Sequence, residues 1–158
     1  MTAKQSLEQI IAELPVFQNL SPDYLELITG CASNVRFDEG HVVFREGEPA
    51  DAFYAVRHGK VAIDVFVPQR GAVTIQTVSA GDVLNWSWLF PPHVNQYDAR
   101  CLTLVRALAF DGACLRGKCE EDHSLGYELM KRFARIMIER VRATRLQLLD
   151  IYGNTTHV

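Results

Sequence analysis

The stretch Phe37–Ile63, which reads FDEGHVVFREGEPADAFYAVRHGKVAI, decides the fold of this chain. Gly40, Gly47 and Gly59 divide it into short runs rich in aromatic and β-branched residues. Such runs are typical of β-strands, and glycine permits the tight turns between them. The stretch therefore predicts short antiparallel strands with apolar side chains available for a core.

The same pattern continues on the C-terminal side as far as residue 110, with further breaks at Gly71 and Gly81. Turns every ~8 to 12 residues are typical of an antiparallel sandwich or barrel. Residues 61–78, VAIDVFVPQRGAVTIQTV, predict a hairpin in which PQRG is the loop. Its first strand alternates apolar residues on one face, at Val61, Ile63, Val65 and Val67. We expect an α+β fold, mainly β, built as an antiparallel β-roll or jelly-roll barrel.

Helical signals flank this β region on both sides. Ser6 and Gln9 form a capping box, and Ser21 followed by Pro22 marks a second helix start. Residues 122–152 contain no proline, and Gly153 stands where a helix commonly ends. We expect a single domain over residues 1–158, with a helical lead at 1–32, a β-roll at 33–111 and C-terminal helices at 112–153, formed as one long helix or two joined by a bend.

The C-terminal helix carries apolar residues at alternating spacings of four and three, the a/d seam of a coiled coil. An exposed apolar seam favours a partner, so we expect a homodimer through the C-terminal half of this helix. The seam comprises Met130, Ala134, Met137, Val141, Thr144, Leu148 and Ile151.

Composition narrows the function classes. A net charge of −3 and a pI near 5.9 argue against a polyanion as the main partner. No stretch approaches the ~18 consecutive apolar residues of a membrane span, and the first residues lack the hydrophobic run of a signal peptide. We expect a cytoplasmic protein with no membrane partner. The four cysteines form no CxxC pair, so free thiols are the expected state.

The glycine and aromatic spacing of 37–61 follows the pattern F-x-x-G-x-x-V-F-x-x-G-x-x-x-D-x-F-Y-x-V-x-x-G-x-V. This closely resembles the cyclic nucleotide-binding domain of the catabolite activator (Crp/Fnr-like) family. The resemblance implies a β-roll, leading helices and a terminal helix that pairs two subunits. It also implies a phosphate-binding cassette of the form F-G-E-L-A-L, followed after several residues by R-S/T-A. Family transcription factors append a helix-turn-helix, but only NTTHV follows Gly153 here, so no DNA partner is expected.

The cassette departs from the family pattern at the residues that contact the nucleotide. Along LNWSWL, Leu84 stands at the Phe position, Asn85 at the Gly and Trp86 at the Glu. The arginine position falls on Asn95 or Gln96, neither of which carries charge. Enclosing a phosphodiester without a cation would cost several kcal/mol, so tight cyclic AMP binding is not expected.

Two interpretations of this pocket stay open. Trp86 and Trp88 either form an aromatic wall for another small molecule or fill the space where a nucleotide would lie. In the first case Ser87, Asn85, Asn95, Gln96 and Tyr97 would supply hydrogen bonds. Arg100 either points inward and partly replaces the missing arginine or is an ordinary surface residue. In relatives a hydroxyl residue on the paired helix can touch the bound base, which makes Thr144 a candidate and Arg145 a weaker one.

No catalytic or cofactor signal accompanies these features. Cys114, Cys119 and His123 would offer three zinc ligands but no fourth, so neither a metal nor another cofactor is expected. The sequence contains no GxSxG, HExxH or P-loop, and Glu120, Glu121 and Asp122 are typical of a helix N-terminus. The first hypothesis is a non-enzymatic signalling module whose β-roll senses a small molecule, or has lost that ability, and transmits its state through the C-terminal helix to a dimer or partner protein. The second is a structural or protein-interaction domain with a filled pocket.

Overall fold

The glycines that separate the predicted strands adopt positive φ angles in the computed structural model, which describes residues 6–155. Gly59, with φ of 94°, turns the chain between β3 (Ala52–His58) and β4 (Val61–Val67). A Cβ at this position would collide with the carbonyl oxygen of Leu104. Glycine is therefore required at Gly59 by both conformation and space.

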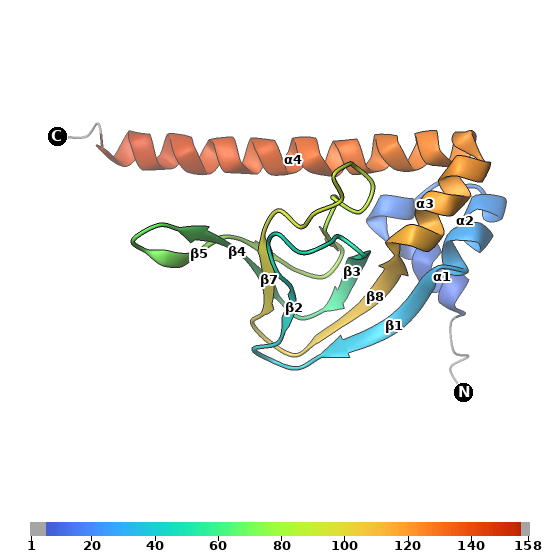
Figure 1. Ribbon diagram of the computed structural model, residues 1–158, viewed down its shortest axis with the longest axis horizontal. Helices are drawn as coiled ribbons and strands as arrows, with labels where there is room; N and C mark the ends of the chain where they lie inside the picture. The colour runs from blue at the N-terminus through green and yellow to red at the C-terminus, as the bar shows by residue number, and fades with distance from the viewer. Residues whose placement is uncertain (1–5, 156–158) are drawn as a thin grey trace.

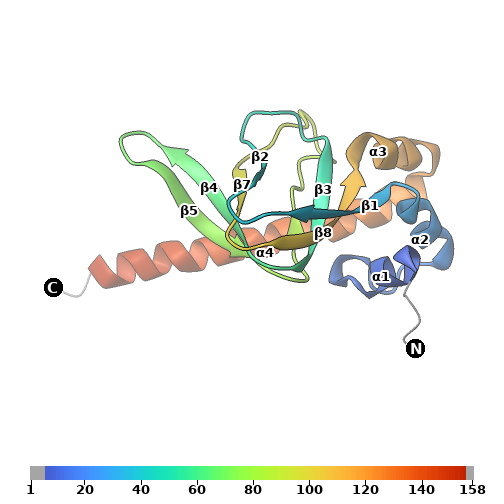
Figure 2. The ribbon, with the colours of Figure 1, turned by 90° about the horizontal axis from the view of Figure 1, so that it is seen from below.

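The strands form two antiparallel sheets of four, as the sequence predicted (Figures 1 and 2). One sheet has the order β1-β8-β3-β6 and the other β2-β7-β4-β5, so strands distant in sequence lie side by side. The remaining strands are β1 (Ala32–Phe37), β2 (Val42–Phe44), β5 (Gly71–Val78), β6 (Val83–Leu84), β7 (Asp98–Cys101) and β8 (Val105–Asp111). The predicted β-roll and the β4–β5 hairpin are confirmed.

The leading helices begin where their caps predict. Ser6 and Gln9 form both hydrogen bonds of a capping box before α1 (Leu7–Glu13), and Ser21 caps α2 (Pro22–Thr29). A short 3-10 helix, η1 (Pro15–Phe17), joins them. No helix within residues 6–155 is long and apolar enough to cross a bilayer.

The C-terminal region forms two helices that meet in a bend at Asp122. These are α3 (Gly112–Glu121) and α4 (His123–Thr155), and the Asp122 carboxylate accepts hydrogen bonds from the first N–H groups of α4. Glu120 and Glu121 end α3, so their predicted place at a helix N-terminus is wrong; only Asp122 is there. Gly153 does not end α4, because an interior glycine costs only about 1 kcal/mol and the helix continues to Thr155.

Two apolar cores divide the molecule, and β3 contributes to both. Phe53 and Ala55 face the helices, whereas Tyr54 and Val56 face the interior between the two sheets. This alternation follows from the period of two in a strand. Figure 1 shows the long α4 lying across the roll, with the leading helices at one end.

A disulfide joins Cys31 to Cys114, with a Cα–Cα distance of 5.8 Å. The expectation that all cysteines are free thiols is therefore wrong; Cys101 and Cys119 are free. The two bonded residues are 83 positions apart, and only the antiparallel pairing of β1 with β8 brings them together. The bond also removes Cys114 from any zinc site with Cys119 and His123.

Candidate functional site

The candidate site is the loop between β6 and β7, residues 85–97, which lies between the roll and α4 (Figure 1). Its first residue, Asn85, has φ of 76°, in the left-handed region that glycine and asparagine tolerate best. That conformation explains how asparagine can stand at the Gly position of the cassette.

Asn85 uses its side chain to hold the loop. Its amide nitrogen donates to the carbonyl of Ala52 at 2.9 Å and to the side-chain oxygen of Asn95 at 2.8 Å. Its side-chain oxygen accepts from the backbone N–H of Ser87 at 3.2 Å. Asn95 in turn donates to the carbonyl of Arg45 at 3.0 Å. Both amides are 3% exposed, so they form a buried structural network whose polar groups are occupied by the protein.

Trp88 lies in the core beneath the helices. It is 0% exposed and stacks on Phe53 with ring centroids 4.8 Å apart, while Phe133 of α4 meets it edge-on at 5.3 Å. The indole N–H has no hydrogen-bond partner among the described residues. Trp88 therefore packs in the core between the loop and α4 and is not a member of the apolar cluster in the roll interior.

Trp86 packs on the other side of the loop, against the interior of the roll. Its ring lies 5.3 Å from that of Tyr97, and the guanidinium of Arg140 from α4 lies over it at 5.6 Å. The Tyr97 hydroxyl accepts from the backbone N–H of Asn85 at 2.9 Å. Burial raises the pKa of Tyr97 above 10.0, although Arg140 and the Asn85 N–H act in the opposite direction.

Arg140 connects α4 to the roll. Its guanidinium donates to the side-chain oxygen of Gln76 at 3.1 Å and to the carbonyl of Val83. Sequence reasoning did not select this residue. The helical period offered the signal, because Arg140 follows Phe133 by seven positions and Ile136 by four, on the side of α4 that packs against the roll.

The other candidates lie apart from the loop interior. Gln96 is exposed and donates to the carbonyl of Val94 at 3.0 Å. Arg100 in β7 forms a 3.0 Å ion pair with Asp64, and its neighbours in the strand, Ala99 and Cys101, are the ones that face the interior. Strand alternation therefore turns Arg100 outward, so it does not take the place of a phosphate-binding arginine.

Thr144 and Arg145 lie on the exposed part of α4, beyond the roll. The Thr144 hydroxyl donates to the carbonyl of Arg140 at 2.9 Å, and both side chains are exposed. Neither contacts the candidate loop within the chain.

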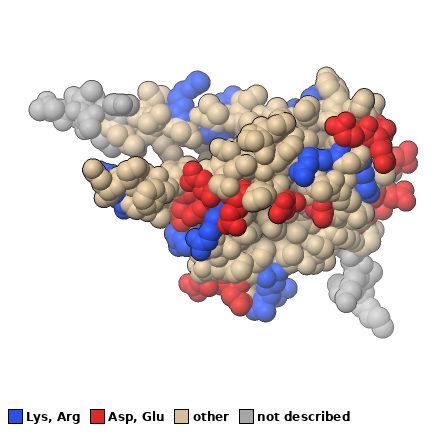
Figure 3. All heavy atoms as spheres, viewed as in Figure 1, with Lys and Arg blue, Asp and Glu red and all other residues tan. Residues whose placement is uncertain are grey.

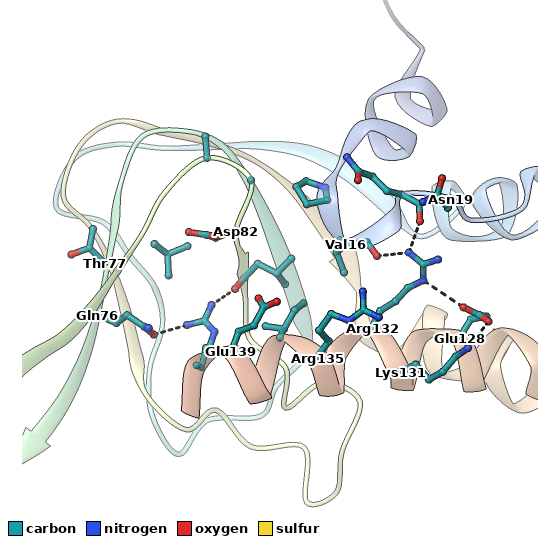
Figure 4. A pocket seen from close by; sticks show the side chains of 18 residues that line it. Val16, Asn19, Gln76, Thr77, Asp82, Glu128, Lys131, Arg132, Arg135 and Glu139 are labelled. Atoms are coloured by element: carbon teal, nitrogen blue, oxygen red, sulfur yellow. Dashed lines mark hydrogen bonds and ion pairs between the residues drawn. The ribbon is translucent and has the colours of Figure 1, made fainter. Parts of the chain in front are cut away.

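Two cavities lie near these residues. The smaller, of about 310 Å³, opens beside β2 and the Asn85–Asn95 pair and is lined by Phe44, Tyr54 and neighbouring residues. The larger, of about 730 Å³, is a groove between η1, the turn before β6 and α4 (Figure 4). At one end of the groove, Arg132 donates to the carbonyls of Val16 and Gln18. At the other end, Arg140 donates to the side-chain oxygen of Gln76. No group of three potential metal-ligating side chains occurs within residues 6–155.

Comparisons with known proteins agree with this architecture. A family model for the cyclic nucleotide-binding domain matches residues 34–122. The CRP-like cAMP-activated global transcriptional regulator of Mycobacterium tuberculosis (strain ATCC 25618 / H37Rv) is 28% identical over 145 residues, which is 92% of this chain and 63% of the regulator. The chain thus spans less than two thirds of that relative.

Solved structures share the fold. A protein from Geobacter metallireducens GS-15, described as a cyclic nucleotide-binding protein, superposes with a TM-score of 0.76 at 27% identity, covering 87% of this chain and 99% of its own. A cyclic nucleotide-binding domain from Methylobacillus flagellatus KT gives a TM-score of 0.77 at 16% identity, covering 91% and 81%. Since the family model matches more than half of the chain, this chain belongs to the cyclic nucleotide-binding domain family and has the β-roll fold of its Crp-like regulators.

Proposed function

We propose that this chain is a non-enzymatic regulatory module whose β-roll does not bind a cyclic nucleotide tightly and whose state is transmitted through α4. The observation that carries the proposal is the packing of Trp86 between Tyr97 and Arg140. Trp86 stands where the family's cassette has its glutamate, so an indole occupies the position of the ribose-binding carboxylate.

The charge of the roll interior supports the same conclusion. A cluster of buried hydrophobic side chains, among them Val61, Ile63 and Tyr97, lines the roll interior. A cyclic phosphodiester is an anion, and enclosing it there without a cation would cost several kcal/mol. Arg100 is paired with Asp64 on the outer face, and Arg140 is held by Val83 and Gln76. We therefore infer that the cAMP activation described for the Mycobacterium regulator does not extend to this chain.

A second candidate function is the sensing of a small molecule other than a cyclic nucleotide in the 310 Å³ cavity. This volume lies at the lower end of the range of roughly 300 to 1,000 Å³ typical of ligand sites. Phe44 and Tyr54 offer aromatic surface there, and the buried amides of Asn85 and Asn95 form one edge. The lining also includes the charged residues Arg45, Glu48 and Asp51. An effector in this cavity would touch the loop that packs against α4, and so could favour one position of the helix over another.

We propose a second copy of the chain as the partner of α4. An apolar stripe of exposed side chains runs along the helix. Its members are about half exposed or more, at Met130 (48%), Ile138 (59%), Val141 (59%), Leu148 (51%) and Ile151 (59%). Most of them belong to the a/d seam predicted from the sequence. Pairing α4 of two chains along this seam would remove the apolar side chains of both helices from water.

Thermal unfolding with and without 1 mM cyclic AMP or cyclic GMP tests the nucleotide claim. A ligand at 100 times its dissociation constant adds about 2.7 kcal/mol, which moves the midpoint of a domain of this size by about 5 to 10 °C. We expect a shift below about 1 °C, equal to that with 5′-AMP. A shift of several degrees specific to the cyclic nucleotides would contradict the proposal.

A further inference from the structure

The disulfide between Cys31 and Cys114 lies where the β-roll joins both sets of helices. Cys31 follows α2 and immediately precedes β1, while Cys114 lies in the first turn of α3. The strands between them pair at their ends, with Ala32 opposite Phe110, and the Asp111 N–H donates to the carbonyl of Cys31 at 2.9 Å. The bond therefore closes the base of the roll and attaches the start of α3 to the end of the helical lead.

This attachment extends to α4 because α3 and α4 pack closely. A Cβ at Gly126 in α4 would lie 3.3 Å from the Cβ of Cys119 in α3, so the two helices meet without room between them. Lys118 of α3 also donates to the carbonyl of Leu27 at 2.8 Å. Besides the disulfide, Leu115 of α3 is fully buried in the same core as Ile11 and Ile28 of the lead. Breaking the disulfide at Cys114 therefore removes one of the contacts that set the direction of α4.

The surroundings of the pair allow thiol exchange. Cys114 is partly exposed, whereas Cys31 is 8% exposed, so an external thiolate would meet the Cys114 sulfur first. Cys114 lies in the first turn of α3, and its backbone N–H donates to the Asp111 carboxylate at 2.9 Å. The two free cysteines lack this setting, and burial raises the pKa of both Cys101 and Cys119.

We propose that Cys31 and Cys114 form a reversible redox modification site that sets how firmly α3 and α4 are held against the helical lead. In reduction, the thiolate of a low-molecular-weight thiol attacks the Cys114 sulfur, the S–S bond breaks and Cys31 leaves as a thiolate that takes a proton. A second thiol then attacks the mixed disulfide, releases Cys114 and forms the oxidised small-molecule disulfide. In the reverse direction that disulfide accepts the two electrons, and two small thiols leave.

The test uses the purified full chain, without any ligand or dimer variant, so its outcome is separate from that of the function proposed above. Free thiols are counted by alkylation and mass spectrometry after exposure to oxidised glutathione and, separately, to dithiothreitol. We expect two modified cysteines in the oxidised chain and four in the reduced chain, with full interconversion. Hydrogen exchange of residues 112–130 should be at least about tenfold faster in the reduced chain, and the unfolding midpoint should fall by about 5 to 15 °C.

Matched variants separate this site from the other cysteines. Cys114→Ser should reproduce the fast exchange of the reduced chain under oxidising conditions, and Cys119→Ser should exchange like the unmodified oxidised chain. Because the reduced wild type reports the same state, the test does not depend on either variant folding well. Four modified cysteines after oxidation would overturn the proposal, and so would a disulfide whose reduction leaves exchange in α3 and α4 unchanged.

Discussion

At the scale of single residues, Asn85 combines a backbone conformation that glycine favours with a side chain that bonds across the loop. Its φ of 76° lies in the left-handed region. Its amide then bonds Ala52 and Asn95, which connects the loop to neighbouring segments of the roll. Trp86 packs against the interior of the roll, and Trp88 is buried in the core beneath α4. Packing and internal hydrogen bonds thus hold all three residues in the loop.

Gly59 and Gly40 provide a matched test of the turns that shape the roll. Both have positive φ, of 94° and 85°, but a Cβ at Gly59 would collide with Leu104, whereas none of the described atoms lies within 4 Å of one at Gly40. We expect Gly40→Ala to lower the free energy of unfolding by about 1 to 2 kcal/mol through backbone strain alone. Gly59→Ala should lower it by at least about 1 kcal/mol more. Urea unfolding measures both; equal losses would show that the contact with Leu104 relaxes freely.

At the scale of elements, α4 has two faces with different roles. Leu125, Leu129 and Phe133 are fully buried against the core, and Arg132 and Arg140 attach the helix to the lead and to the roll. Beyond Arg140 the helix has little beneath it except the β4–β5 hairpin, which it meets through the bond from Gln147 to the carbonyl of Ile75 at 3.1 Å (Figure 1). The C-terminal half is therefore the part of α4 with apolar surface left to cover.

Val141→Glu and Leu146→Glu test the proposed pairing of α4. The two side chains are equally exposed in the single chain, at 59% and 61%, but only Val141 belongs to the a/d seam. A carboxylate at Val141 would be buried between paired helices, so we expect the dimer dissociation constant to rise at least about tenfold, measured by analytical ultracentrifugation. Leu146→Glu should leave it within about threefold. A monomeric parent chain, or equal effects of the two variants, would contradict the pairing.

At the scale of the whole molecule, charge and protonation limit the conditions under which the fold is stable. On the face shown in Figure 3, acidic and basic side chains are interspersed. Together with the net charge of −3, this supports the proposal that DNA is not a partner.

Protonation of buried side chains affects the stability of the fold. Burial raises the pKa of Tyr54, Tyr97, Cys101 and Cys119.

These raised pKa values predict a loss of stability at alkaline pH. Cysteine and tyrosine ionise in the unfolded chain near their ordinary values of 9.0 and 10.0, while the folded chain keeps its protons to higher pH. The unfolded state then binds fewer protons, so the free energy of unfolding falls as pH rises above about 9 and is fully present below it. Tyr97 alone contributes a slope of up to about 1.4 kcal/mol per pH unit above pH 10.

Chemical unfolding of the parent chain and of Tyr97→Phe between pH 8 and 11 measures this slope. The variant loses the hydrogen bond from the Asn85 N–H and should be less stable below about pH 9. Above pH 10, however, its stability should fall less steeply than that of the parent. Parallel curves would mean that Tyr97 ionises as easily in the folded chain as in the unfolded one.

The sequence by itself determined the local structure of this protein. The turns at Gly40, Gly47 and Gly59, the caps at Ser6 and Ser21 and the hairpin of residues 61–78 all form as predicted. Each depends on conformational preferences and periodicities that act within a few residues along the chain. The family pattern spans the same stretch, so fold and family were both accessible before any coordinates.

Only the tertiary structure decided which groups meet across the chain. The Cys31–Cys114 bond, the ion pair of Arg100 with Asp64 and the position of Arg140 over Trp86 each join residues at least 36 positions apart. Local patterns carry no information about such pairs, because strand order and helix direction determine them. For the same reason the sequence could not place Trp88, which the tertiary structure buries between Phe53 and Phe133 of α4.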